Sequence, residues 1–128
     1  MQLTPTYNII RNVYKPKPQP KTVDIIIDTI FAAVEREFGI SKTVLKSQNR
    51  KRPVQNAKKV AYYLLYNYTP SSLKQVGKIM GGMDHSSVII GIQTLEDLCR
   101  YDKTYTEQLR KCELAISSVQ SKYPKNKS

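Results

Sequence analysis

The sequence predicts an all-α fold, a compact helical domain of about five to six helices that contains a helix-turn-helix. Three observations support this prediction. Apolar residues recur at spacings of three and four along most of the chain, no segment shows the alternation of a strand, and a glycine pair separates a short amphipathic segment from a longer one. The 128 residues are enough for one domain with short tails.

Both ends of the chain are expected to be tails. Within residues 1–21, lysine and proline alternate in a way that is typical of an extended, solvated spacer. An apolar patch precedes this spacer and could dock on the domain or on a partner: Tyr7, Ile9, Ile10, Val13 and Tyr14. Residues 124–128 form a short basic end, so the domain is expected to span residues 22–123.

The first helix is predicted over residues 23–38, with Thr22 as its N-cap and Gly39 as its end. One face is apolar throughout, so this helix should contribute to the core through Val23, Ile26, Ile27, Ile30, Phe31, Val34 and Phe38.

A basic loop is expected between a short helical turn at 41–46 and the next helix. The loop covers residues 47–52, and the helix covers residues 53–68 because it opens on a proline, which suits the first helical position. Lys58 and Lys59 are expected to point away from its buried face. That face comprises Val54, Ala57, Val60, Ala61, Leu64 and Leu65.

A short helix over residues 73–80 is predicted from a capping box, in which Ser72 and Gln75 each bond the other's backbone. Gly77 lies inside this helix, where glycine costs about 1 kcal/mol relative to alanine. We therefore expect a neighbouring helix to approach closely at this position.

Gly81-Gly82 should form the turn that follows. Asp84 is predicted to cap a longer helix that ends near Cys99 and turns Val88, Ile89, Ile92 and Leu95 inward. Residues 72–99 thus have the order of a helix-turn-helix, whose second helix reads DNA with its N-terminal residues.

A last helix is predicted from Tyr105, with a capping box formed by Thr104 and Glu107 and with Pro124 beyond its end. Its apolar seam is narrow, and it either packs on the domain or pairs with another chain. The seam comprises Tyr105, Leu109, Cys112, Ile116, Val119 and Tyr123.

The charge distribution favours a nucleic-acid partner. A net charge of +11 and a pI near 9.7 would also suit an anionic membrane surface or solubility alone. However, residues 38–83 hold nine Lys/Arg and no Asp or Glu. Such a one-signed segment beside a helix-turn-helix indicates double-stranded DNA.

The cysteines and the termini suggest a cytoplasmic protein without a cofactor. Cys99 and Cys112 form no CxxC pair and lie on apolar faces, which predicts buried free thiols in a reducing compartment. A single histidine makes a zinc site unexpected, and we expect neither a metal nor a cofactor. The polar N-terminus does not resemble a signal peptide, and no apolar run approaches the roughly 20 residues that span a bilayer.

The octapeptide GGMDHSSV at 81–88 is the most specific motif in the chain. It resembles the Gly-Gly-Arg-Asp-His-Thr-Thr-Val signature of the C-terminal DNA-binding domain of the bacterial chromosomal replication initiator DnaA. The resemblance extends over residues 23–98, including the spacing to the basic loop. It implies a Trp-repressor-like helical fold that binds an asymmetric DNA box as a monomer on the bacterial nucleoid.

The resemblance also implies base-reading roles for Arg50, Asp84, His85 and Ser86. Asp84 would accept a hydrogen bond from a cytosine amino group, and His85 would pack on a thymine methyl. Arg50 would enter an A·T-rich minor groove. Simpler alternatives are that Asp84 only caps the helix, that His85 is a surface histidine, and that Arg50 contacts a phosphate.

Further contacts with the DNA backbone are expected from basic side chains around the motif and from one hydroxyl. Such contacts position a protein without specifying sequence, and each lysine alone could equally be a solubilising surface residue. The set comprises Lys46, Lys51, Arg52, Lys58, Lys59, Lys74, Lys78 and Ser87.

Several positions depart from the family pattern. Met83 replaces the arginine of the signature, Asn56-Ala57 replaces an Arg-Pro pair, and Lys74 replaces a proline. Ser86 and Ser87 keep the hydroxyls of the two threonines but lose their methyl groups. Each altered base contact is worth about 1–3 kcal/mol, which is enough to shift the site preference, so these departures leave the exact DNA site open.

The leading hypothesis is a stand-alone, sequence-specific double-stranded DNA-binding protein. The chain has no Gly-x-x-x-x-Gly-Lys-Ser/Thr phosphate loop, so we expect no ATP hydrolysis and no origin opening by this chain alone. It would regulate replication initiation, with replication proteins as further partners, or compete for initiator sites on behalf of a phage or mobile element.

Two other classes of function compete with this hypothesis. A protein-interaction module on the same helical fold would use the last-helix seam and the N-terminal patch, but it would not need the acid-free segment 38–83. An enzyme is disfavoured because Asp84, His85 and Ser86 are consecutive, so their side chains diverge by about 100° per residue and cannot form a relay. A monomer is expected, with a dimer through residues 105–123 as the alternative.

Overall fold

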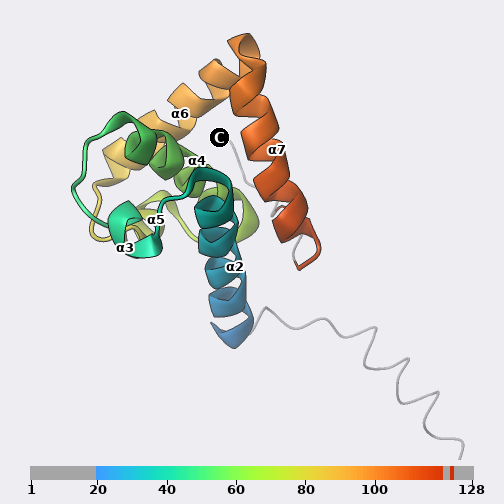
Figure 1. Cartoon of the computed structure of the whole chain (residues 1–128). Helices are drawn as coiled ribbons and strands as arrows, with labels where there is room; N and C mark the ends of the chain where they lie inside the picture. The colour runs from blue at the N-terminus through green and yellow to red at the C-terminus, as the bar shows by residue number, and fades with distance from the viewer. Residues whose placement is uncertain (1–19, 120–121, 123–128) are drawn as a thin grey trace, which may run out of the picture.

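The computed structural model describes residues 20–119 and residue 122, and this part of the chain consists of helices and connecting loops (Figure 1). The all-α prediction is confirmed. No helix among these residues is long and apolar enough to cross a bilayer. The helices are α2 (Pro20–Phe38), α3 (Lys42–Leu45), α4 (Arg52–Tyr68), α5 (Leu73–Ile79), α6 (His85–Tyr101) and α7 (Lys103–Ser117).

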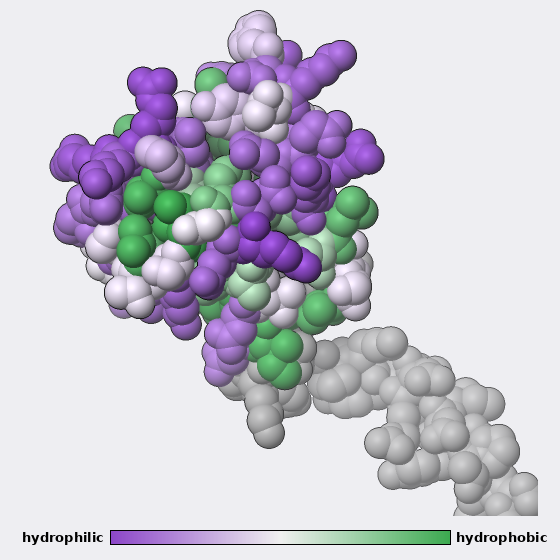
Figure 2. Space-filling view, viewed as in Figure 1, coloured by the Kyte–Doolittle hydropathy of each residue, from purple (hydrophilic) through white to green (hydrophobic). Residues whose placement is uncertain are grey.

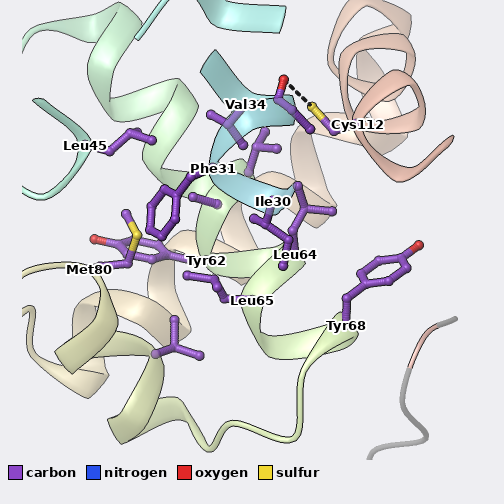
Figure 3. Close-up of a cluster of buried hydrophobic side chains, with 14 of the residues drawn as sticks. Ile30, Phe31, Val34, Leu45, Tyr62, Leu64, Leu65, Tyr68, Met80 and Cys112 are labelled. Carbon is purple, nitrogen blue, oxygen red and sulfur yellow. Dashed lines mark hydrogen bonds between the residues drawn. The ribbon is translucent and has the colours of Figure 1, made fainter. Parts of the chain in front are cut away.

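Helix α4 is the central element, because α2, α3, α5, α6 and α7 all pack against it. Its Leu64 and Leu65 are fully buried, and each such side chain contributes roughly 1.5–3 kcal/mol of hydrophobic free energy. Figure 3 shows Leu45 of α3 and Met80, at the end of α5, directed into the same cluster. Leu45 thus anchors α3 in the core, and Val76 and Met80 anchor α5.

Helix α2 begins earlier than the sequence predicts. It starts at Pro20, so Thr22 lies inside the helix and the predicted N-cap is wrong. A proline near a helix start is favourable because its missing N–H has no intrahelical partner there. Gly39 ends the helix as predicted, with a φ of 71°. The apolar patch at 7–14 and the basic C-terminal residues 124–128 lie outside the described residues.

Helix α7 also begins and ends elsewhere. The side chain of Asp102 caps it by accepting from the backbone N of Thr104 at 2.9 Å, so the predicted box of Thr104 and Glu107 is wrong. The carboxylate of Asp102 lies closer to the first free N–H groups and carries a charge that suits a helix N-terminus. The helix ends at Ser117 rather than continuing toward Tyr123, which is not among the described residues.

The apolar seam of α7 packs within the domain. Cys112 and Ile116 are buried against the core, and Tyr105 and Leu109 are half-buried beside them. The Cys112 thiol donates to Ala33 O of α2 at 3.8 Å (Figure 3). The seam from Tyr105 to Ile116 therefore packs on the domain, whereas Val119 is exposed.

Both cysteines are free, as predicted. Cys112 is buried, whereas Cys99 is only half-buried, so the prediction of burial holds fully for Cys112 alone. Burial raises the pKa of both thiols, that of Cys112 to about 12.

Candidate nucleic-acid interface

The segment from α5 to α6 forms the predicted helix-turn-helix. Its capping box is confirmed, since the Ser72 hydroxyl accepts from Gln75 N at 3.2 Å and the Gln75 side chain accepts from Ser72 N at 2.7 Å. Gly81 and Gly82 make the turn with φ values of 90° and 86°, a left-handed conformation that glycine adopts without strain. Helix α6 extends two residues beyond the predicted end at Cys99.

The turn is fastened to α5 at Gly77. The carbonyl of Gly77 accepts from Gly82 N at 3.0 Å and from Met83 N at 2.8 Å. A Cβ at Gly77 would overlap the carbonyl oxygen of Met83. The close neighbour of Gly77 is therefore the backbone of its own turn, and the expectation of a neighbouring helix is wrong.

The N-terminus of α6 is open to solvent. Asp84 occupies the N-cap position, but its carboxylate makes no capping hydrogen bond, which corrects the predicted side-chain cap. The carboxylate lies 3.7 Å from His85 Nδ1, and the side chains of His85 and Asp84 are 57% and 74% exposed. Ser86 and Ser87 are also exposed. The acceptor oxygens of Asp84 thus remain available to a ligand.

The basic loop between α3 and α4 lies beside this helix end. Gln48 Nε2 reaches the sulfur of Met83 at 4.0 Å, and the backbone carbonyl of Lys46 packs against Gly81. Within the loop, the Asn49 side chain accepts from Lys51 N at 2.9 Å, which is a local turn typical of asparagine. Arg50 follows in this loop, where its exposed side chain lines a hollow together with Ser87 of α6.

Lys58 does not point into solvent, contrary to the prediction. The residue is only 4% exposed, and its ammonium group donates to Ser47 O at 2.6 Å and to Asn49 O at 3.3 Å. Burial lowers the pKa of Lys58, and the positive charge of Arg50 lowers it further. Position 58 lies four residues after Val54 and three before Ala61, beside the buried face, and the long stem of lysine lets the charge reach the loop carbonyls from there.

One hollow of about 280 Å³ connects the loop, α4 and α6. It brings together four residues that the sequence assigns to DNA contact: Arg50, Lys58, Lys59 and Ser87. The close approach of α6 to α4 depends on Gly91, since a Cβ there would lie 2.6 Å from Cδ2 of Tyr62. Arg52 and Asn56 line an adjoining hollow with Lys59 and Arg50.

The other lysines predicted to contact the DNA backbone do not line this hollow. Lys51, Lys74 and Lys78 are exposed, and Lys46 is half-buried at the end of α3. Figure 2 shows hydrophilic side chains gathered over the α3–α4 loop. Between described residues, the salt bridges involve Lys42, His85, Arg100, Lys111 and Lys122. The basic residues that line the hollow take part in none of them, so no acid of the described residues neutralises their charge.

Sequence reasoning missed Ile90. This side chain is 61% exposed and lines the hollow beside Met83 and Ser87. Residues three and four apart share a helix face, so Ile90 lies on the same face as Ser86 and Ser87. This spacing from the two serines is the sequence signal that places Ile90 on the face predicted to contact DNA.

A short capped helix, a glycine turn, a second helix with an open N-terminus and a flanking basic loop define a helix-turn-helix domain. The chain belongs to the family described as "Bacterial dnaA protein helix-turn-helix", whose sequence pattern matches residues 27–95.

Three relatives named "Chromosomal replication initiator protein DnaA" show how far the similarity extends. The protein from Synechococcus sp. is 33% identical over 102 residues, which cover 80% of this chain and 21% of that protein. The protein from Mesorhizobium japonicum is 36% identical over 79% of this chain and 20% of its own length. The protein from Bacteroides fragilis is 30% identical over 84% and 22%. The chain therefore spans about a fifth of the length of these relatives.

Proposed function

We propose that this chain is a sequence-specific double-stranded DNA-binding protein that recognises a site of the DnaA-box type. The observation that carries the proposal is the open N-terminus of α6, flanked by cations that are not neutralised by acids of the described residues. A recognition helix enters the major groove with this end, and a basic loop beside it can follow the backbone into the next minor groove.

Base reading is assigned to Asp84, His85, Ser86 and Arg50. The carboxylate of Asp84 is an acceptor for a cytosine amino group, and the exposed imidazole of His85 can pack on a thymine methyl. Ser86 presents a hydroxyl that can donate or accept. Ile90 adds an apolar group on the face of Ser86, which supports a contact with a second thymine methyl.

Affinity for the backbone is assigned to the remaining cations and to Ser87. Each lysine or arginine that neutralises a phosphate releases condensed counterions, so binding should weaken steeply with salt. The N–H groups at the start of α6 and its helix dipole favour a phosphate as well. Lys58 is removed from this set because its ammonium group is already engaged with the loop.

The biological role is proposed at the level of replication initiation. The relatives are named as initiators, and the matched region is about a fifth of their length. We propose that the DNA contact made by this chain serves to regulate initiation or to compete for initiator sites, on the nucleoid in the cytoplasm. A monomer on DNA is favoured because the buried part of the α7 seam is covered by α2 and α6. The same packing weakens the alternative of a protein-interaction module that uses this seam.

Comparison of wild type with Asp84→Ala on single-base variants of a duplex selected from a random pool tests the proposal. Loss of the Asp84 acceptor should weaken binding to the preferred duplex by about 1–3 kcal/mol and relax sequence discrimination at one base pair, since the other contacts persist. Equal losses on the preferred and on random duplexes would exclude base reading by Asp84.

A further inference from the structure

Lys58 holds the loop that carries Arg50. Its Nζ donates to the carbonyls of Ser47 at 2.6 Å and Asn49 at 3.3 Å, on either side of Gln48. Gln55 Nε2 donates to the same Asn49 carbonyl at 2.8 Å. Two side chains of α4 therefore hydrogen-bond to the loop immediately before Arg50.

The arrangement uses a buried charge without a carboxylate partner among the described residues. Lys58 is 4% exposed, and its ammonium is bound by backbone carbonyls instead of an acid. Burying an ammonium is costly unless its donors are satisfied, so the carbonyls of the loop are ordered by the lysine as much as the lysine is held by them. An apolar residue at this position would avoid the cost of desolvating an ammonium group. We therefore infer that the contribution of Lys58 is the ordering of the loop.

The ordered loop determines where the side chain of Arg50 lies. Its side chain is exposed and lines the hollow beside Ser87 of α6. An arginine on an unfixed loop would lose more conformational entropy on entering a groove than one on an ordered loop. The loop is also braced against the turn, through Gln48 and the sulfur of Met83 at 4.0 Å.

We propose that Lys58 is a positioning residue for base reading by Arg50: it orders the α3–α4 loop so that Arg50 enters the minor groove while α6 occupies the major groove. This inference rests on the proposed function. It assigns Lys58 to sequence discrimination rather than to phosphate neutralisation, although both roles would weaken DNA binding.

The test compares Lys58→Met with its neighbour Lys59→Met in the full chain. Each A·T pair of the preferred duplex is replaced in turn by G·C and by inosine·C. Only G·C adds an amino group to the minor groove, so a position that tolerates inosine·C but not G·C is read there. Arg50→Ala identifies the position that depends on Arg50.

Lys58→Met should reduce the penalty for G·C at that position by about tenfold, the size of one base-pair discrimination. It should leave the dependence of affinity on salt nearly unchanged. The effect should vanish in an Arg50→Ala background, because both substitutions remove one interaction. Lys58→Arg, which keeps the donors, should restore most of the discrimination. Lys59→Met should weaken all duplexes alike and lower the salt slope by about 1.

A Lys58→Met variant that behaves like Lys59→Met would overturn the inference and leave the proposed function intact. Absence of any sequence preference in the wild-type chain would overturn both. If Lys58→Met does not fold, Gln55→Leu removes the second hydrogen bond to the Asn49 carbonyl, at a half-buried position. It should then give a smaller loss of discrimination at the same base pair, and unchanged discrimination would count against the loop's being held from α4.

Discussion

Gly77→Ala should destabilise the domain, although alanine is the better helix former. Helix propensity alone predicts a gain of about 1 kcal/mol at this interior position of α5. In the structure, a Cβ at Gly77 would overlap the carbonyl oxygen of Met83 and lie 3.2 Å from its carbonyl carbon. The obstacle is backbone, so it cannot turn aside as a flexible side chain would.

The cost follows from what must move. Separating Met83 from Gly77 lengthens the bonds from Gly82 N and Met83 N to the Gly77 carbonyl, which are now 3.0 and 2.8 Å. Each contributes about 1 kcal/mol, and residual overpacking adds about 1–3 kcal/mol. After the gain in propensity, the net loss in the free energy of unfolding is about 2–4 kcal/mol.

Urea denaturation followed by far-ultraviolet circular dichroism measures this loss directly. Gly39→Ala is the matched control, because Gly39 has a φ of 71° and nothing within 4 Å of its Cβ position. It should cost about 1–2 kcal/mol from the left-handed backbone alone. A Gly77→Ala variant as stable as wild type, or more stable, would refute the close approach of α5 to its turn.

Three other results are expected. Lys59→Ala should lower the slope of log Kd against log salt by about 1 on every duplex, because a phosphate contact carries no sequence information. Ile90→Ala should weaken binding to the preferred duplex by about 1 kcal/mol or more. Replacing one thymine by deoxyuridine should remove the difference between the variant and wild type, since the thymine methyl is the partner of Ile90. Cys112 should resist alkylation in the folded chain at pH 8 while Cys99 reacts slowly, because burial raises the pKa of Cys112 to about 12. The neutral thiol favours the folded state, so stability from this group is full below pH 9 and is lost as the pH rises toward 12.

Each of these three predictions can be contradicted. A change of sequence preference in the Lys59→Ala variant would show that Lys59 reads bases. An Ile90 variant that is equally affected on thymine and deoxyuridine duplexes would exclude the methyl contact. Rapid alkylation of Cys112 under native conditions would contradict its burial between α7 and α2.

The sequence predicted the elements whose signals are local. The capping box of Ser72 and Gln75 and the glycine turn are written in adjacent residues, and both are confirmed. Thr104 failed as part of a cap because Asp102, a stronger acceptor two residues earlier, competes for the same helix start. Propensity ranks such candidates but does not choose between neighbours.

The errors that matter for the site concern groups whose partners are distant in the chain. Lys58 bonds carbonyls nine and eleven residues away, and this depends on the path of an irregular loop. Helical periodicity places its Cα near the buried face but says nothing of where a long side chain ends. Gly77 was correctly recognised as a close contact, yet the neighbour is a turn whose course only the structure gives.

Base reading by the N-terminus of α6 is tested most directly by fluorescence anisotropy of the full chain on a duplex that carries the family's box and on a shuffled duplex, at near-physiological salt. A preference of about a hundredfold or more, equivalent to about 2.7 kcal/mol, is the result expected of sequence-specific recognition. No binding to either duplex, or equal binding to both and to every duplex recovered by random-sequence selection, would contradict it.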